Sequence, residues 1–279
     1  MKNILVATDL TDRSKNAFAR AVQLAQLSGA KLHVLHVRAP LPDDSDPEKI
    51  DATAAAISNR VDAFILDRAG NLEIENEVHI EQGGRVHDLI VQTCRRVRAD
   101  LAVVGRSSRS RDFPTAILRT SGRVVVNATF PVLIVSEPVS GNYAHVLLEA
   151  GEPDDTVSMA MLISDFGPDV RMTVLAVSGV AARSTIGLFR RLAAAWRRRR
   201  LSNLLSRIAA HRQARRLPHD RVRLETAEGA PLDVLQARLG STRMDLVAVT
   251  DMVRRLQDPE LGERTRQALA SGSCDVIAY

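Results

Sequence analysis

The sequence predicts an α/β protein of two tandem domains, each built on a doubly wound parallel sheet of five strands. Short continuous apolar runs alternate with segments of helical spacing, a pattern typical of buried parallel strands joined by crossover helices. The whole pattern occurs twice along the 279 residues. Right-handed crossovers then make each sheet parallel, with helices on both faces.

In the first half of the chain, five apolar runs are expected to be strands, separated by four helical segments. The first helix stops at Gly29, because glycine readily takes the left-handed conformation that ends a helix, and Thr11 or Asp12 can cap its start. The expected strands are Asn3–Thr8, Lys31–Val37, Leu72–Ile80, Leu101–Val104 and Pro131–Val135, and the other helices are Ile50–Ala69, Val86–Val97 and Ala116–Asn127.

The second half repeats the first segment by segment, which indicates an internal duplication. A cluster of Pro, Ser, Gly and Asn at residues 138–142 marks the boundary. We therefore expect domains at residues 1–138 and 143–279. The matched segments start at Asn3 and His145, at Lys31 and Arg171, at Gly84 and Gly229, and at Pro131 and Asp275.

Composition indicates a globular protein, with 45% hydrophobic and 25% charged residues. No apolar run approaches the roughly 20 residues of a membrane helix, and the N-terminus lacks the long apolar stretch of a secretory signal. A cytoplasmic location is therefore expected. Cys94 and Cys274 are expected to be small buried hydrophobic residues rather than a redox or metal pair.

Residues 101–135 resemble the C-terminal signature of the universal stress protein family. In that signature a strand ends in glycine and continues as G-x2-G-x9-G-[ST], before a helix and a PVL-type last strand. Aligned without gaps, the first glycine is Gly105, the second falls on Ser108, the third on Leu118 and the Ser/Thr on Arg119. The resemblance implies a fold of the adenine-nucleotide α-hydrolase type and a nucleotide loop that has lost two of its three glycines.

The resemblance also implies a site for ATP or AMP in the first domain. Asp9, just after the first strand, matches the family position that contacts the nucleoside, although an acid there can equally favour the following helix N-terminus. The loop hydroxyls can donate to phosphate. The cofactor-binding residues that we predict are Ala7, Thr8, Asp9, Val37, Val104, Gly105, Ser107, Ser108, Arg119, Thr120 and Ser121.

An eroded loop is the alternative to a working one. The bulky side chain of Leu118 would stand where the family backbone approaches its ligand, and the loop would then be an inherited segment with a solvated basic face. In the second domain Gly151 replaces the acid, residues 250–255 contain no glycine, and Asp251 would repel phosphate. We expect the second site to be inactive.

The function implied by the resemblance is a non-catalytic stress or signalling adaptor that senses an adenine nucleotide and contacts partner proteins of unknown identity. The rival interpretation is a nucleotide-hydrolysing enzyme, which needs a metal-binding carboxylate near the phosphates, with Asp9 and Asp112 as candidates. No Walker A, G-x-S-x-G or C-x-x-C motif occurs, so we expect no catalytic residue.

We also expect no metal site among the seven histidines. His33 and His36 lie on one expected strand at odd spacing, so their side chains face opposite sides and cannot chelate together. His79 and His87 lie on either side of a glycine pair and have no matching carboxylate pattern. A strand or surface role is the favoured interpretation for all of them.

An arginine-rich segment distinguishes the second domain. Between Arg183 and Arg223 there are thirteen arginines and a single acid, Asp220. Two apolar stripes predict a long kinked helix or two helices, with a basic run where their phase changes. A core-packed helix with a solvated basic face is favoured, and the alternative is an adaptor for an anionic membrane or nucleic-acid surface. The basic run is Arg197, Arg198, Arg199 and Arg200.

The last strand of each domain is expected at a sheet edge, where an apolar strand invites pairing and must be covered. Members of the family commonly dimerise through this strand. We therefore expect Pro131–Val135 to pair antiparallel with Asp275–Tyr279 inside one chain, which gives an intramolecular pseudo-dimer. A monomer of this kind and a homodimer are the two assemblies that the sequence leaves open.

Overall fold

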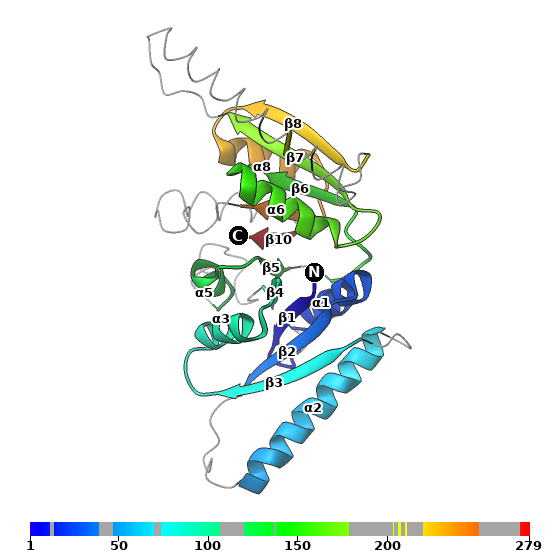
Figure 1. Cartoon of the computed structure of the whole chain (residues 1–279), viewed down its shortest axis with the longest axis vertical. Helices are drawn as coiled ribbons and strands as arrows, with labels where there is room; N and C mark the ends of the chain where they lie inside the picture. Colours follow the sequence, from blue (N-terminus) through cyan, green and yellow to red (C-terminus); the bar gives the residue numbers. More distant parts are fainter. Residues whose placement is uncertain are drawn as a thin grey trace. The chain divides into compact units, whose positions relative to one another are not determined.

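The computed structural model describes residues 1–11, 14–38, 47–69, 74–106, 120–136, 138–178, 203, 206, 207, 210, 220–250 and 274–279. These residues fall into two compact units, Met1–Gly141 and Asn142–Tyr279. Within each unit, five strands form a parallel sheet against which the described helices pack (Figure 1).

The first unit alternates strands and helices as predicted, and its strands follow the order β3-β2-β1-β4-β5. All four pairings within the unit are parallel. The strands are β1 (Asn3–Thr8), β2 (Lys31–Arg38), β3 (Asn76–Gln82), β4 (Leu101–Gly105) and β5 (Val132–Val135), and the described helices are α1 (Lys15–Ser28), α2 (Pro47–Ala69), α3 (Val86–Val97) and α5 (Thr120–Asn127).

Helices cover both faces of this sheet, which explains the continuous apolar strands. Helix α1 packs beside α2, and α3 packs beside α5 on the opposite face (Figure 1). The central strand β1 pairs with β2 on one side and β4 on the other, and Ile4, Leu5 and Val6 are fully buried. A strand buried on both faces needs apolar side chains in both directions, so the usual alternation disappears.

The ends of α1 confirm one prediction and correct another. The helix ends before Gly29, whose φ of 66° is the left-handed conformation expected of a glycine in that position. Its N-cap is Ser14 and not Thr11, whose carbonyl instead accepts the Ser14 N–H at 3.1 Å. Asp12 lies outside the described residues. The first loop is thus longer than predicted because Thr11 belongs to a turn of its own.

Strand β3 begins later than the predicted Leu72–Ile80 and covers Asn76–Gln82. Its limits follow from its neighbour, since β3 pairs with β2 from Leu32 opposite Asn76 to Arg38 opposite Gln82. One residue earlier, the Glu75 carbonyl already accepts the Leu32 N–H at 2.8 Å, and residues 71–73 lie outside the described residues. Pairing with the start of β2, rather than local hydrophobicity, therefore marks where β3 starts.

The second unit has the strand order β10-β9-β6-β7-β8, and its pairings are also parallel. The arginine-rich run Arg197–Arg200 lies outside the described residues, so its helical structure stays a prediction. The strands are β6 (His145–Glu149), β7 (Arg171–Ser178), β8 (Val222–Glu228), β9 (Leu246–Val249) and β10 (Asp275–Ala278), and the described helices include α6 (Pro153–Ser164) and α8 (Pro231–Ser241).

The same hydrogen-bonded staple occurs in both units and supports the duplication. Before β4, the Asp100 carboxylate accepts the backbone N–H of Lys2 at 2.5 Å and of Asn3 at 3.0 Å. Before β9, the Asp245 carboxylate accepts the N–H of Ala144 at 2.9 Å and of His145 at 2.8 Å. Each aspartate thus ties the start of its own strand to the start of the central strand.

The two cysteines are buried, as predicted. Cys94 is 1% exposed and Cys274 is 5% exposed, and both are free thiols. Burial raises the pKa of Cys94 to about 12, so its thiol stays protonated and unreactive at neutral pH. Within the described ranges, no helix has the length and hydrophobicity needed to cross a membrane.

We predict that Asp245→Ala lowers the free energy of unfolding by about 1–2 kcal/mol, because two backbone N–H groups lose a charged acceptor. Chemical denaturation of the full chain measures this loss. Asp169→Ala is the matched control, since Asp169 is exposed and removal of a surface acid changes stability by no more than about 0.5 kcal/mol. Equal stability of the two variants would contradict the structural role of Asp245.

Candidate functional site

A crevice of about 320 Å³ opens at the carboxyl ends of β1, β2 and β4 in the first unit. Strand β1 lies between β2 and β4, so the chain leaves β1 in one direction and later returns on its other side. This is the topological switch point of a doubly wound sheet, and crevices at such points are the usual ligand sites of open α/β folds.

Eight of the eleven predicted cofactor-binding residues line this crevice. They come from four places far apart in the sequence: the ends of β1, β2 and β4, and the start of α5. Whether they bind a nucleotide stays a prediction, and Ser107, Ser108 and Arg119 lie outside the described residues. The eight are Ala7, Thr8, Asp9, Val37, Val104, Gly105, Thr120 and Ser121.

Five further lining residues were absent from the prediction: Ser14, Leu35, Val86, Ile90 and Arg106. Leu35 lies two residues before Val37 on β2, so period-two alternation was the signal that could have found it. Val86 and Ile90 are four residues apart on α3. Their helical spacing predicts that they face the core. It does not indicate that the first turn of α3 borders a crevice.

The loop after β1 holds Asp9 at the mouth of the crevice. The Asp9 carboxylate accepts two hydrogen bonds from Thr11, from the backbone N–H at 3.0 Å and from the hydroxyl at 2.6 Å. Burial alone would raise the pKa of Asp9, but the hydrogen bonds from Thr11 and Ser14 outweigh it and hold that pKa below its ordinary value. Asp9 is therefore an anion at neutral pH.

The backbone that carries Asp9 is held from several directions. The Thr8 hydroxyl accepts the Leu10 N–H at 3.0 Å and lies 2.7 Å from the Ser14 hydroxyl. Leu10 has a φ of 56°, an uncommon value for a residue with a side chain, and Arg60 donates to its carbonyl at 3.0 Å. These contacts hold the loop in one conformation, so Asp9 is positioned before any ligand arrives.

The crevice is lined by two kinds of side chain. Thr8, Asp9, Ser14, Thr120 and Ser121 present hydroxyls and a carboxylate, and several other lining residues are aliphatic. Among the described lining residues, Asp9 and Arg106 are the charged ones. A molecule with a flat apolar part and a polar, hydroxyl-bearing part fits such a surface. The aliphatic residues are Leu35, Val37, Val86, Ile90 and Val104.

The first half of the chain matches a known family. Residues 1–136 match the model of the universal stress protein family. A universal stress protein from Thermus aquaticus is 29% identical over 134 residues, which are 48% of this chain and 98% of that protein. A universal stress protein A homolog from Pasteurella multocida is 24% identical over 138 residues, 48% of this chain and 95% of that protein.

The chain therefore carries a universal stress protein domain. A universal stress protein of known structure from Archaeoglobus fulgidus overlaps 99% of this chain and 95% of its own, with a TM-score of 0.62 and 14% identity. At that identity the overlap shows the fold alone. It extends the α/β fold of the universal stress protein domain to the second unit.

The second unit differs from the universal stress protein domain at the two positions that correspond to Asp9 and Gly105. In the first unit Ala7 pairs with Val104, Asp9 follows β1, and Gly105 is the last residue of β4. In the second unit Glu149 pairs with Val249, and the corresponding residues are Gly151 and Thr250. In the first unit the larger side chain, Asp9, follows the central strand and the glycine ends its neighbour. In the second unit the glycine follows the central strand and the larger side chain, Thr250, follows its neighbour.

Thr250 fills the space that a side chain at residue 151 would need. A Cβ atom on Gly151 would lie 2.2 Å from the Thr250 hydroxyl oxygen, far inside van der Waals contact. Thr250 is 7% exposed, and its hydroxyl has no hydrogen-bond partner among the described residues. The second unit therefore has neither the acid nor room for one, while Asp251 lies outside the described residues.

We predict that Gly151→Ala lowers the free energy of unfolding by about 1–3 kcal/mol, because the added methyl overlaps the Thr250 hydroxyl. The cost should largely disappear when the substitution is made in a Thr250→Ala chain. Gly240→Ala, in helix α8 with no atom within 4 Å of the added Cβ, is the matched control and should stabilise by up to about 1 kcal/mol. An equal cost of Gly151→Ala in both backgrounds would exclude this clash as its cause.

Proposed function

We propose that the first domain binds an adenine nucleotide, AMP or ATP, and that the chain acts as a stress or signalling adaptor through contacts with other proteins. The observation that carries the proposal is the crevice at the switch point, which is lined by an ionised Asp9 together with aliphatic side chains. The universal stress protein match of residues 1–136 supports it.

The aliphatic and the polar side chains of the crevice suit the two parts of a nucleoside, the base and the sugar. An adenine ring buries its faces against aliphatic side chains such as Val37 and Ile90, while the ribose hydroxyls donate hydrogen bonds to a carboxylate. Asp9 is well placed for the second role, because it is ionised and held by Thr11. A preformed acceptor requires little reorganisation when the ligand binds.

The phosphate end of the proposed site involves Arg106, Thr120 and Ser121, which line the same crevice. A guanidinium and hydroxyls are suitable phosphate partners. The two replaced glycines fall in the loop that would surround the outer phosphates. We therefore propose that the nucleoside and first phosphate supply most of the affinity, so that AMP and ATP bind with similar strength.

We favour binding over catalysis for this site. Hydrolysis of a nucleotide requires a metal-binding carboxylate or an activated nucleophile beside the phosphates. Among the described lining residues, Asp9 is the one carboxylate, and its hydrogen bonds to Thr11 serve a positioning role. The other candidate acid, Asp112, lies outside the described residues. The resemblance to a family that acts through protein contacts supports the same conclusion.

We predict that Asp9→Ala lowers the affinity for AMP and ATP about 10–100-fold, because the ribose hydroxyls lose a charged acceptor. Titration calorimetry on the full chain measures both ligands. Asp62→Ala, which removes an exposed acid from helix α2, is the matched control and should bind as the wild type does. Unchanged affinity in a folded Asp9→Ala chain would remove Asp9 from the site, and no binding by the wild type would overturn the proposed function.

We also propose that the second domain is a degenerate copy that serves as a structural partner of the first. Gly151 and Thr250 leave its crevice without the acid and without the space for one. Within its own unit, β5 pairs with β4 alone and β10 pairs with β9 alone. Each unit thus has an edge strand that needs a cover, and pairing of the two within one chain would satisfy both as a pseudo-dimer.

We predict that deletion of residues 275–279 causes the chain to dimerise or aggregate, because β5 loses the strand proposed to cover it. Size-exclusion chromatography with light scattering measures the change. Tyr143→Phe is the control, since it removes the buried hydrogen bond from Tyr143 to Asp275 but keeps β10, and it should leave the chain monomeric. A truncated chain that stays folded and monomeric would contradict the pseudo-dimer.

A further inference from the structure

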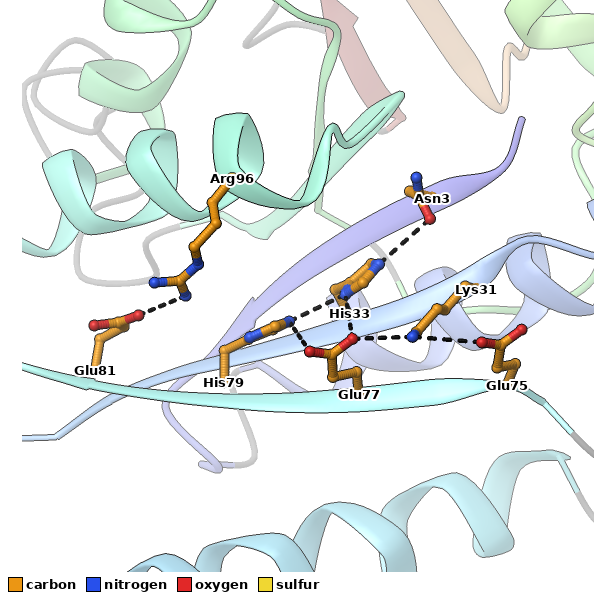
Figure 2. Close-up of polar contacts among 8 residues, drawn as sticks. All are labelled: Asn3, Lys31, His33, Glu75, Glu77, His79, Glu81 and Arg96. Atoms are coloured by element: carbon orange, nitrogen blue, oxygen red, sulfur yellow. Dashed lines mark hydrogen bonds and ion pairs between the residues drawn. The ribbon is translucent and has the colours of Figure 1, made fainter.

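A second polar cluster lies on β2 and β3 of the first sheet (Figure 2). It borders the crevice, since His79 pairs in register with the crevice residue Leu35. His33 is the third residue of β2, and it pairs in register with Glu77 on β3. His79 follows Glu77 by two residues on β3, so the three side chains are on one face of the sheet. The cluster lies toward the amino ends of the strands, whereas the crevice is at their carboxyl ends.

The potential ligand atoms of these three residues converge. His33 Nδ1 lies 3.0 Å from His79 Nε2, and the Glu77 carboxylate oxygens lie 3.7 Å from His33 Nδ1 and 3.9 Å from His79 Nε2. All three atoms are within 4.8 Å of one another. In a tetrahedral zinc site with bonds of about 2.0–2.1 Å, the ligand atoms are about 3.3 Å apart. The His33–His79 spacing is within a few tenths of an ångström of that value. The two Glu77 oxygens face different histidines, so the Glu77 side chain must turn to bring one oxygen close to both rings.

Asn3 orients the His33 ring for ligation. The Asn3 side-chain oxygen lies 3.4 Å from His33 Nε2 and can accept its proton, which leaves a lone pair on Nδ1. His79 Nε2 then donates its proton to His33 Nδ1 across the 3.0 Å contact (Figure 2). For a metal ion to bind both rings, His79 would carry its proton on Nδ1 instead, which leaves a lone pair on Nε2 beside that of His33 Nδ1. Support of a ligating histidine by an oxygen on its other nitrogen is typical of metal sites.

The surroundings favour a metal ion as well. His33 is 5% exposed and the His79 side chain 10%, while the Glu77 side chain is 49% exposed and leaves the cluster open to solvent. Burial lowers the pKa of both histidines, so both rings are neutral, which is the form that binds a metal. The nearby Glu81 is already paired with Arg96 at 2.6 Å, so it is not a fourth ligand here.

Lys31 is the competing cation. Its ammonium lies 2.9 Å from the Glu77 carboxylate and 3.4 Å from that of Glu75. A divalent ion can displace this partly exposed ion pair, but the Lys31 ammonium lowers the affinity of Glu77 for that ion as long as it is present. Lys31 can keep its bond to Glu75 while Glu77 turns toward the histidines.

We propose that His33, Glu77 and His79 bind one divalent transition-metal ion, with Zn²⁺ the best match and a fourth coordination position left for water or a partner's side chain. Two imidazoles and one carboxylate are a zinc ligand set that leaves a position open. Imidazole ligands favour Zn²⁺, Cu²⁺ and Ni²⁺ over Mg²⁺ and Ca²⁺. This site would give the universal stress protein domain a second ligand, independent of any nucleotide.

Titration of the chelator-treated full chain with ZnCl₂ alone tests the proposal. We expect one Zn²⁺ bound at this site, and Glu77→Gln and His79→Gln should each lower its affinity at least about tenfold. Asp169→Asn and His145→Gln are the matched controls, since each removes an exposed acid or imidazole of the second unit, and both should bind as the wild type does. Because the Glu77 side chain is half exposed, the Glu77→Gln chain should fold, so that its Zn²⁺ affinity can be measured.

The Lys31→Gln variant distinguishes a metal site from a cluster whose hydrogen bonds and ion pairs only stabilise the sheet. Removal of the competing ammonium should tighten Zn²⁺ binding, whereas a structural role for the same contacts predicts no gain. The visible spectrum of bound Co²⁺ should show tetrahedral coordination in the wild type and lose it in His79→Gln. Zn²⁺ affinity that is unchanged in folded Glu77→Gln and His79→Gln chains, no tightening in Lys31→Gln, or no Zn²⁺ binding by the wild type would each overturn the site.

Discussion

The pairing of β1 with β2 on one side and β4 on the other is the constraint on which the first domain depends. It buries Ile4, Leu5 and Val6 completely and satisfies their backbone groups with two neighbours. It also places the chain reversal of the doubly wound fold beside the end of β1. The crevice exists because the next strand after β1 goes to one side and β4 goes to the other.

The same parallel register creates polar clusters at both ends of the strands. At the carboxyl ends it brings Asp9, Val37 and Gly105 to one crevice. Toward the amino ends, it sets His33 opposite Glu77 and next to His79. Because the central strand segments must be apolar on both faces, polar side chains collect where the strands begin and end. The two candidate sites are therefore separate consequences of one sheet.

Comparison of the two units shows which features they share and which they do not. They share the aspartate contact, since Asp100 and Asp245 make equivalent bonds to the start of the central strand. They differ at the end of that strand, because Thr250 occupies the space beside Gly151. The aspartate bonds join two strands of each sheet, whereas a side chain at residue 151 would serve a ligand. Divergence at residues 151 and 250 is thus compatible with an intact fold.

The sequence by itself determined the order of strands and helices, the extent of α3 and the end of α1 at Gly29, because periodicity and a helix-ending glycine are local signals. Its resemblance to the universal stress protein signature also indicated most residues of the crevice, which lie at strand ends and at the start of α5. Only the tertiary structure decided where β3 starts, that Val86 borders the crevice, and that His33 meets His79. Those outcomes depend on register between strands more than forty residues apart, and a local pattern in one strand contains no information about the residue opposite it.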